Sequence, residues 1–173
     1  MHIMINIIAA IQERDQGLGY NNDLLYQLPE DMKFFRTITK DTLVIMGRKT
    51  WESIPEKFRP LPNRENIVIT RQDNYEAPGA ITTKSLSKAI DYAKNTFPEK
   101  EIFIIGGGEI YKQALPLADK LYLTLIDGNK STDIFFPEYK ESFTLETILQ
   151  EKSLSFPTGL LYSILLFTRN RIA

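Results

Sequence analysis

Short apolar segments rich in isoleucine recur along the first two thirds of this chain and favour one architecture. Residues 3–11 form a nearly continuous apolar run, and further runs occupy residues 42–47, 66–70, 101–106 and 120–126. Strands that are apolar on both faces are typical of a parallel sheet covered by helices, whereas a strand with one wet face alternates apolar and polar residues. Segments with helical spacing lie between these runs, so the order of elements predicts an α/β fold.

Two helices and two further strands can be placed from local signals. Residues 29–39 begin with a proline and two acidic residues, which is typical of a helix N-terminus. Ser85 is a good N-cap for a second helix, whose apolar residues recur at intervals of three or four. These residues are Leu86, Ala89, Ile90 and Ala93. Residues 143–149 and 160–168 resemble two longer, antiparallel strands, and no linker or repeat interrupts residues 1–173, so we expect a single domain.

The composition excludes several kinds of chemistry. The chain has 21 Lys and Arg against 22 Asp and Glu, a net charge of −1, no cysteine, and one histidine at position 2. Thiolate metal sites, disulfides and cysteine nucleophiles are therefore excluded, and a histidine-based triad or zinc site is strongly disfavoured. A nearly neutral chain has no electrostatic footprint for nucleic acid or an anionic membrane. Since neither a targeting segment nor a membrane span is visible, we expect a cytoplasmic protein without a metal site.

Glycines and cations follow three of the predicted strands, where each strand ends. Residues 106–108 are glycines, Gly47 precedes Arg48 and Lys49, and Arg71 follows the strand at 66–70. Ligands of open α/β sheets bind at the carboxyl ends of the strands, and cations at a helix start oppose the helix dipole unless an anion lies between them. These residues therefore fit a polyphosphate nucleotide, although from the residues alone solvated surface charge explains them equally well.

Asp31 lies on the apolar side of the first predicted helix. Helical spacing places it on one stripe with Leu28, Met32, Phe35 and Ile38. A carboxylate against the core must be neutralised or paired, because an unpaired buried charge is costly. A ligand that presents two adjacent N–H donors would suit this carboxylate. The alternative is an acidic residue that only stabilises the first turn of its helix.

Seven ordered blocks of the sequence resemble the dihydrofolate reductase family. They are IIAA (7–10), LPEDMKFF (28–35), VIMGRKTWESI (44–54), RPLPNR (59–64), IIGGGEIY (104–111), LYLTLID (121–127) and DIFFP (133–137). The resemblance runs from about Ile5 to Asn170, nearly the whole chain. It implies a central, mostly parallel sheet of about eight strands with an antiparallel C-terminal end, flanked by about four helices.

The resemblance also implies an activity. An enzyme of this family transfers a hydride from NADPH to C6 of 7,8-dihydrofolate, with protonation at N5. The product, 5,6,7,8-tetrahydrofolate, supplies one-carbon metabolism and thymidylate synthesis. The implied partners are the small-molecule substrate and antifolate inhibitors, and we expect a monomer.

Roles for individual residues follow at matching positions. The catalytic residues would be Asp31, Tyr26, Leu24 and Tyr111. The substrate site would comprise Ile8, Ala9, Leu28, Met32, Phe35, Arg36, Ile54, Arg59, Leu61, Arg64, Ile105 and Thr124. The cofactor site would comprise Ala10, Leu18, Gly19, Gly47, Arg48, Lys49, Thr50, Thr70, Arg71, Ile105, Gly106, Gly107, Gly108, Glu109, Ile110 and Tyr111. Asp31 would hold the pterin ring, Arg64 would bind the α-carboxylate of the glutamate tail, and the Gly106–Gly107 peptide would be cis.

The chain departs from the family in its active-site loop. Leu25-Tyr26 stands where the family usually has Pro-Trp. A phenol reaches differently from an indole N–H, so a water-mediated link to the substrate is in doubt. Loss of the proline restraint predicts greater mobility of residues 17–27.

Three other functions remain open. A reductase of riboflavin biosynthesis would share the fold and NADPH, but the acid in LPEDMKFF and the block RPLPNR argue against it. A non-catalytic pterin- or nucleotide-binding module would lack the geometry for hydride transfer. A regulatory interaction protein would not need the cations at the strand ends.

Overall fold

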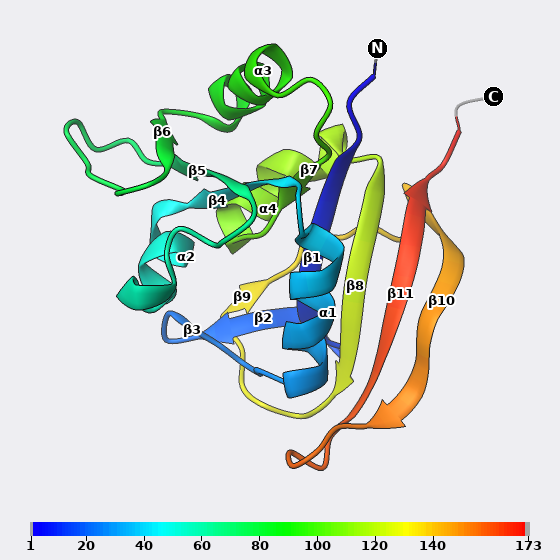
Figure 1. The fold of residues 1–173 in the computed structure, drawn as a ribbon. Helices are drawn as coiled ribbons and strands as arrows, with labels where there is room; N and C mark the ends of the chain where they lie inside the picture. The colour runs from blue at the N-terminus through cyan, green and yellow to red at the C-terminus, as the bar shows by residue number, and fades with distance from the viewer. Residues whose placement is uncertain (1, 172–173) are drawn as a thin grey trace.

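A computed structural model describes residues 2–171, so residues 1 and 172–173, the ends of the predicted domain, lie outside the described residues. A single sheet runs through the described part of the chain (Figure 1). Its main strands are β1 (Ile5–Gln12), β4 (Leu43–Gly47), β5 (Glu65–Ile69), β6 (Ile81–Thr83), β7 (Ile102–Ile104), β8 (Lys120–Asp127), β10 (Phe143–Leu154) and β11 (Leu161–Arg169). Their order across the sheet is β10-β11-β8-β1-β7-β4-β5-β6, which gives the eight strands that the family resemblance implies.

The direction of the strands also agrees with the sequence. Strands β8, β1, β7, β4, β5 and β6 run parallel to one another. Strands β10 and β11 pair antiparallel with each other, and β11 pairs antiparallel with β8. The prediction of a mostly parallel sheet with an antiparallel C-terminal end is therefore confirmed.

Three short strands were not predicted. They are β2 (Gly17–Tyr20), β3 (Asp23–Leu24) and β9 (Ile134–Phe135). Strand β2 pairs with β1, β3 and β9, so residues 17–27, which were expected to be a mobile part of the active-site loop, contain two strands. The pairing of Gly17 with Phe135 depends on a distant part of the chain, and no local pattern signals it.

Residues 2–171 contain four α-helices, as the resemblance implies. They are α1 (Pro29–Thr39), α2 (Arg48–Ser53), α3 (Leu86–Thr96) and α4 (Gly108–Ala114), with short 3₁₀ turns at Glu56–Phe58 and Leu115–Leu117. The N-cap prediction for α3 is confirmed, because Ser85 Oγ accepts a hydrogen bond from the Lys88 backbone N–H at 3.1 Å.

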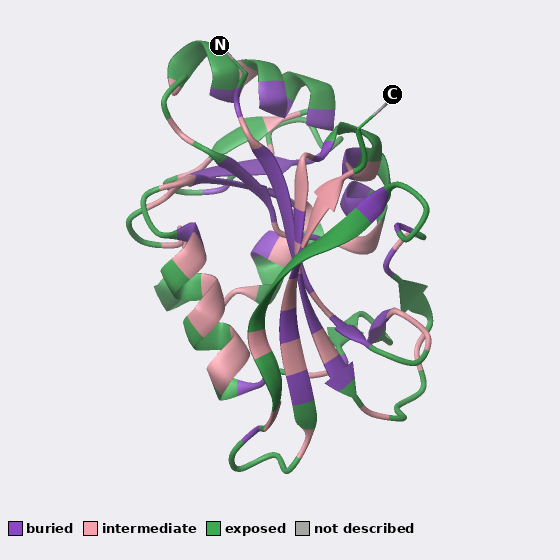
Figure 2. Ribbon diagram, turned by 90° about the vertical axis from the view of Figure 1, so that its right-hand side faces the viewer, coloured by how far each residue is buried: buried purple, intermediate pink, exposed green. Residues whose placement is uncertain are grey.

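The core fills both faces of the sheet, which explains the unbroken apolar runs. Successive strand residues point to opposite faces. On one face Ile7, Ile45 and Ile104 pack with residues of α3 and α4. On the other face Ile8, Met46 and further strand residues pack with Trp51 of α2 and with residues of α1. Figure 2 shows the buried strands at the centre and the largely exposed edge strand β10.

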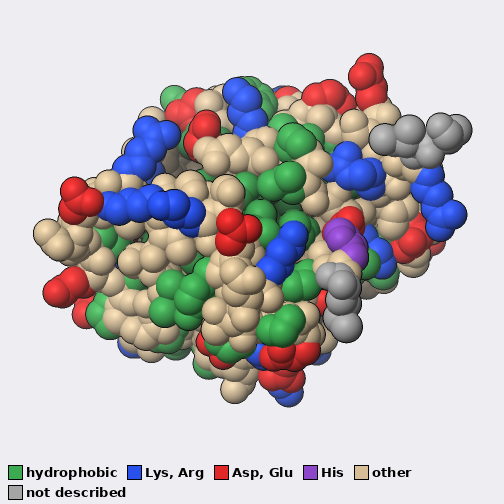
Figure 3. All heavy atoms as spheres, turned by 90° about the horizontal axis from the view of Figure 1, so that it is seen from above, with side chains coloured by type: hydrophobic (Ala, Val, Ile, Leu, Met, Phe, Trp, Pro, Cys, Tyr) green, Lys and Arg blue, Asp and Glu red, His purple; other side chains and the backbone are tan. Residues whose placement is uncertain are grey.

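Charges of both signs lie on the surface. On the face seen from above in Figure 3, Lys and Arg side chains are interspersed with Asp and Glu side chains, as a net charge of −1 predicts. Between residues 2 and 171, no helix has the length and apolar character needed to cross a membrane.

Candidate active site

Asp31 lies in the first turn of α1, where the helix packs against β8. The Thr124 hydroxyl, buried in β8, donates a hydrogen bond to Asp31 Oδ1. Burial raises the pKa of Asp31, and the hydrogen bond from Thr124 opposes part of that rise. Thr124 lies directly beside Ala10 of β1, so the carboxyl group faces the middle of the parallel sheet. The expectation that this carboxylate would lie against the core with a partner is confirmed.

Apolar side chains cluster on the face of the sheet that α1 covers. Phe35, Ile54, Leu61 and Ile105 are partly buried and pack against the core cluster that contains Ile8. Within α1 and its N-cap, Leu28 is 1% exposed, whereas Met32 is 47% exposed. The spacing had placed Met32 on the apolar stripe that faces the core, and this prediction is wrong, because Met32 lies on the open side of the stripe. Partly covered apolar walls of this kind suit a flat, largely apolar ligand.

Two hydrogen bonds and a contact with the Phe35 ring hold the Arg64 side chain in place. Its Nε donates to Pro62 O at 2.9 Å, its Nη1 donates to Thr39 Oγ1 at 3.0 Å, and its guanidinium lies 5.8 Å from the Phe35 ring centroid. Burial and the nearby Arg36 guanidinium lower the pKa of Arg64. No carboxylate of residues 2–171 lies within ion-pair distance of Arg64. Arg64 is therefore not held by an ion pair within the described residues.

Two glycine turns meet at the carboxyl ends of β4 and β7. The Gly47 N–H donates to Gly106 O at 2.9 Å. Gly106 has a φ of +132°, and a Cβ there would lie 3.2 Å from Thr50 Oγ1 and 3.4 Å from the Tyr111 hydroxyl. Only glycine fits this position without strain. The Gly106–Gly107 peptide is cis, as the resemblance implies.

The Tyr111 hydroxyl is an internal anchor. It is buried and donates to Ile8 O at 2.7 Å, which joins α4 to the middle of β1. Burial raises its pKa, and the Asp31 charge adds to the rise. The hydroxyl therefore stays protonated and holds the β1 backbone beside the glycine turn.

The cations at the strand ends differ in their partners. Arg48 Nη1 lies 2.8 Å from Glu52 Oε1, and Glu52 Oε2 accepts a hydrogen bond from the Tyr75 hydroxyl at 2.8 Å. An anion is therefore not needed to explain Arg48. Lys49 and Arg71 are exposed, and neither has an ion-pair partner within the described residues.

The remaining predicted positions are distributed over several elements. Leu18 is 7% exposed, whereas Leu24 is 63% exposed at the edge of the active-site loop. Arg59 donates to Trp51 O at 3.4 Å and lies 5.5 Å from the Trp51 ring centroid. The other residues of this group are Ala9, Gly19, Thr70, Gly107, Gly108, Glu109 and Ile110. In the described part of the chain, no cluster of three or more His, Cys, Asp or Glu could hold a metal ion.

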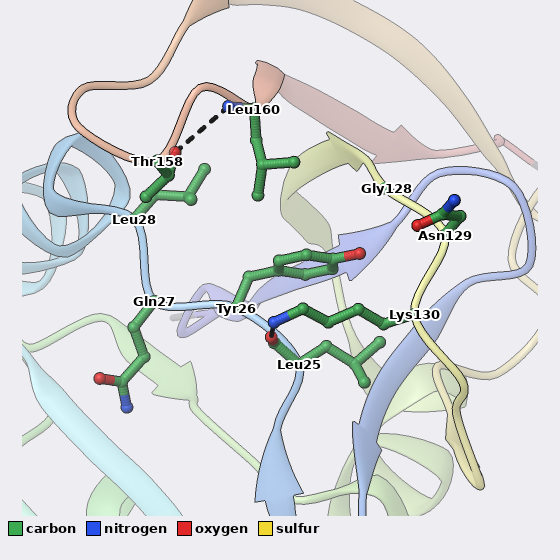
Figure 4. Close-up of a pocket in the computed structure, with 9 residues that line it drawn as sticks. All are labelled: Leu25, Tyr26, Gln27, Leu28, Gly128, Asn129, Lys130, Thr158 and Leu160. Atoms are coloured by element: carbon green, nitrogen blue, oxygen red, sulfur yellow. Dashed lines mark hydrogen bonds between the residues drawn. The ribbon is translucent and has the colours of Figure 1, made fainter.

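Sequence reasoning missed the contacts of Tyr26. Its hydroxyl donates to Gln12 Oε1 at 2.5 Å, and the Lys130 ammonium lies 4.7 Å from its ring centroid. A cavity of about 460 Å³ borders the ring, between the active-site loop, the β8–β9 connection and the β10–β11 turn (Figure 4). Gln12 is a polar residue at the end of an apolar strand, which was a visible signal, whereas no sequence signal marks Lys130.

A second missed contact ties the β10–β11 turn to α1. The Phe156 N–H donates to Glu30 Oε2 at 2.9 Å, and Ser155 Oγ donates to Glu30 Oε1 at 2.7 Å. These two hydrogen bonds lower the pKa of Glu30. The turn is thereby fixed next to the residue that precedes Asp31.

Comparison with known proteins gives a consistent result. A family model described as dihydrofolate reductase matches residues 4–155. The dihydrofolate reductase of Neisseria gonorrhoeae is 43% identical over 153 residues, which cover 88% of this chain and 91% of that protein. The dihydrofolate reductase of Bacillus subtilis is 42% identical over 139 residues (80% and 79%), and that of Saccharomyces cerevisiae is 35% identical over 164 residues (86% and 77%).

Proposed function

This chain belongs to the dihydrofolate reductase family and is an oxidoreductase that reduces dihydrofolate to tetrahydrofolate, and we propose that NADPH is its hydride donor and that Asp31 is its central site residue. The observation that carries the proposal is the Asp31 carboxyl group, paired with Thr124 in an apolar surrounding. The 2-amino group and N3 of a pterin present two adjacent N–H donors, which match the two oxygens of a carboxylate.

The apolar side chains and Arg64 would bind different parts of the substrate. Phe35, Ile54 and Leu61 would cover the pterin and the ring that follows it. The glutamate tail would reach Arg64, whose guanidinium is already held in place by two hydrogen bonds. A donor fixed in advance loses little conformational entropy on binding, so it is well suited to a carboxylate.

Proton transfer to N5 would depend on Asp31, which would bind the opposite edge of the pterin ring. Burial raises the pKa of Asp31 in the free protein, whereas two N–H donors of a bound pterin would favour its charged form, because hydrogen bonds to a carboxylate stabilise the charge. We propose that Asp31 polarises the pterin while a water molecule delivers the proton. The exposed Leu24 and the loop around it would close over the site and exclude bulk water.

The residues at the strand ends fit NADPH. The glycine turn at Gly106 leaves a space that a Cβ would fill, so a ligand can approach the backbone closely there. Backbone N–H groups at Gly107 and Gly108 would hold the pyrophosphate, and Lys49 and Arg71 would bind the 2′-phosphate. When bound, NADPH supplies the hydride. We further propose that the enzyme is cytoplasmic, since a chain without cysteine depends on no disulfide. We also propose that it is a monomer, as the family resemblance implies.

The decrease in absorbance at 340 nm, measured with purified protein, NADPH and dihydrofolate, tests the proposal. Asp31→Asn should reduce turnover by roughly 10²–10⁴-fold, which is the range for loss of a group that assists proton transfer. Asp91→Asn is the matched control, because Asp91 is exposed on α3. Wild-type turnover by Asp31→Asn, or equal turnover with NADH, would contradict the respective part of the proposal.

A further inference from the structure

The turn formed by Leu25 and Tyr26 is held by contacts that the family's usual Pro-Trp could not make in the same way. Leu25 is buried, and its N–H donates to Leu18 O at 3.2 Å. Proline has no N–H, so this bond exists only because residue 25 is not proline. The carbonyl of Leu25 accepts a hydrogen bond from Lys130 Nζ at 2.8 Å. Both backbone polar groups of Leu25 are therefore fixed.

The Tyr26 side chain is held from two directions. Its hydroxyl donates to Gln12 Oε1 at 2.5 Å, and the Lys130 ammonium lies 4.7 Å from the ring centroid, within the range of a cation–π contact. Figure 4 shows the Lys130 side chain along one side of the ring and Leu160 on the other. The hydroxyl is therefore bound to β1 and does not reach Asp31.

Gln12 cannot release this hydroxyl easily. It is fully buried, and its Oε1 also accepts from the Lys130 N–H at 2.8 Å. Its Nε2 donates to Lys130 O at 3.0 Å and to Asp15 Oδ1 at 3.1 Å. Since every polar atom of the amide is bonded, rotation of Gln12 would leave buried groups unpaired, which is costly.

The backbone and the side chain of Lys130 contact different residues. Its backbone pairs with Gln12, whereas its side chain alone reaches Leu25 and Tyr26. The β8–β9 connection also packs closely on the phenol, because a Cβ added at Gly128 would overlap the Tyr26 ring. A substitution of the Lys130 side chain can therefore release the turn while the connection itself stays in place.

We propose that Lys130 is a positioning residue for dihydrofolate reduction, which holds the Leu25–Tyr26 turn through the Leu25 carbonyl and the Tyr26 ring. This inference rests on the proposed function, because it concerns the loop that would close over the substrate and cofactor. Lys130 touches neither ligand in this role. It acts through Leu25 and Tyr26, which follow the exposed Leu24 directly in sequence.

Lys130→Met tests the role of the ammonium, because it keeps an unbranched apolar side chain and removes the charge and the donors. We expect the single-turnover rate of NADPH oxidation with dihydrofolate to fall by about 5–10-fold, the effect of losing one charge-assisted hydrogen bond. Lys130→Arg should restore most of the rate, since a guanidinium can donate to a carbonyl and stack on a phenol. Lys94→Met, at an exposed position on α3, is the matched control.

Amide hydrogen exchange of the free protein gives a readout that does not depend on activity. Lys130→Met should accelerate exchange in residues 17–27 and leave α3 unchanged, with a Tm within about 3 °C of the wild type. The proposal is overturned if Lys130→Met keeps the wild-type rate and exchange, if Lys130→Arg loses as much as Lys130→Met, or if exchange rises throughout the protein. A wild-type protein that does not oxidise NADPH would refute the proposed function, whereas the exchange result would still test the contact.

Discussion

Replacing Arg64 by leucine tests binding of the substrate's glutamate tail without altering the contacts of Asp31. Arg64 directly precedes β5, and its guanidinium donates to Pro62 O and Thr39 Oγ1. Arginine has five N–H donors, so three remain after these two bonds. Because no carboxylate of residues 2–171 pairs with it, the free donors are available to a ligand.

The size of the effect follows from the kind of contact that is lost. A hydrogen bond between charged groups contributes about 1.5–3 kcal/mol, which corresponds to a rise in the dihydrofolate KM of roughly 10–100-fold. We expect kcat of Arg64→Leu to change little, because the tail contact is the same in the ground state and the transition state. The variant should also lose stability, since two neutral acceptors lose their donor at about 0.5–1.5 kcal/mol each.

The stability loss makes a second variant necessary. Thr39→Val removes one anchor of Arg64 and the bond from Thr39 Oγ1 to Phe35 O at 2.7 Å, but leaves the guanidinium in place. We expect it to lower the Tm in the same way while raising the dihydrofolate KM much less. Both variants should bind a small 2,4-diaminopyrimidine without a glutamate tail nearly as well as the wild type. A proportional loss of dihydrofolate and diaminopyrimidine binding in Arg64→Leu would show that Arg64 supports the cleft and does not bind the tail.

Three further outcomes are expected. Burial raises the pKa of Asp31 in the folded protein, so the native state binds this proton more tightly than the unfolded chain and loses stability as the pH rises from the ordinary carboxyl range through the raised native value. Asp31→Asn removes this loss, so its Tm relative to the wild type should increase over that pH range in calorimetry. Arg71→Ala should weaken NADPH binding by about 1–3 kcal/mol and barely alter NADH binding, as measured by titration calorimetry; equal losses would exclude recognition of the 2′-phosphate. Ser85→Ala should cost about 1 kcal/mol of stability in urea denaturation without a change in turnover, because it removes the N-cap of α3.

The elements that were predicted correctly have local sequence patterns that mark them. Helix α1 begins and ends where Pro29 and the apolar spacing indicated, because a proline and two acids mark a first turn. The parallel strands were visible because both of their faces are buried, which leaves no polar position to interrupt the run. The capping of α3 by Ser85 required only one residue type at one position.

The parts that could not be predicted depend on distant pairs of residues. Strand β2 pairs with β9, and Tyr26 contacts both Gln12 and Lys130. Besides the polar Gln12 at the end of β1, one further missed contact had a local signal. Arg48 and Glu52 have the spacing of an ion pair along a helix, and this spacing could have indicated that Arg48 has a partner without a bound anion.

Contacts with distant residues also affect the predicted mobility of the active-site loop. Loss of a proline at position 25 predicts a more mobile loop, because a suitable proline stabilises a folded chain by about 0.4–1 kcal/mol through the unfolded state. The structure adds two hydrogen bonds at the same residue, one donated by Leu25 and one donated by Lys130. At about 0.5–1.5 kcal/mol each, these bonds are large enough to offset the missing restraint. The predicted mobility of the loop therefore depends on its contacts with Leu18 and Lys130, which lie outside the turn itself, as well as on the identity of residue 25.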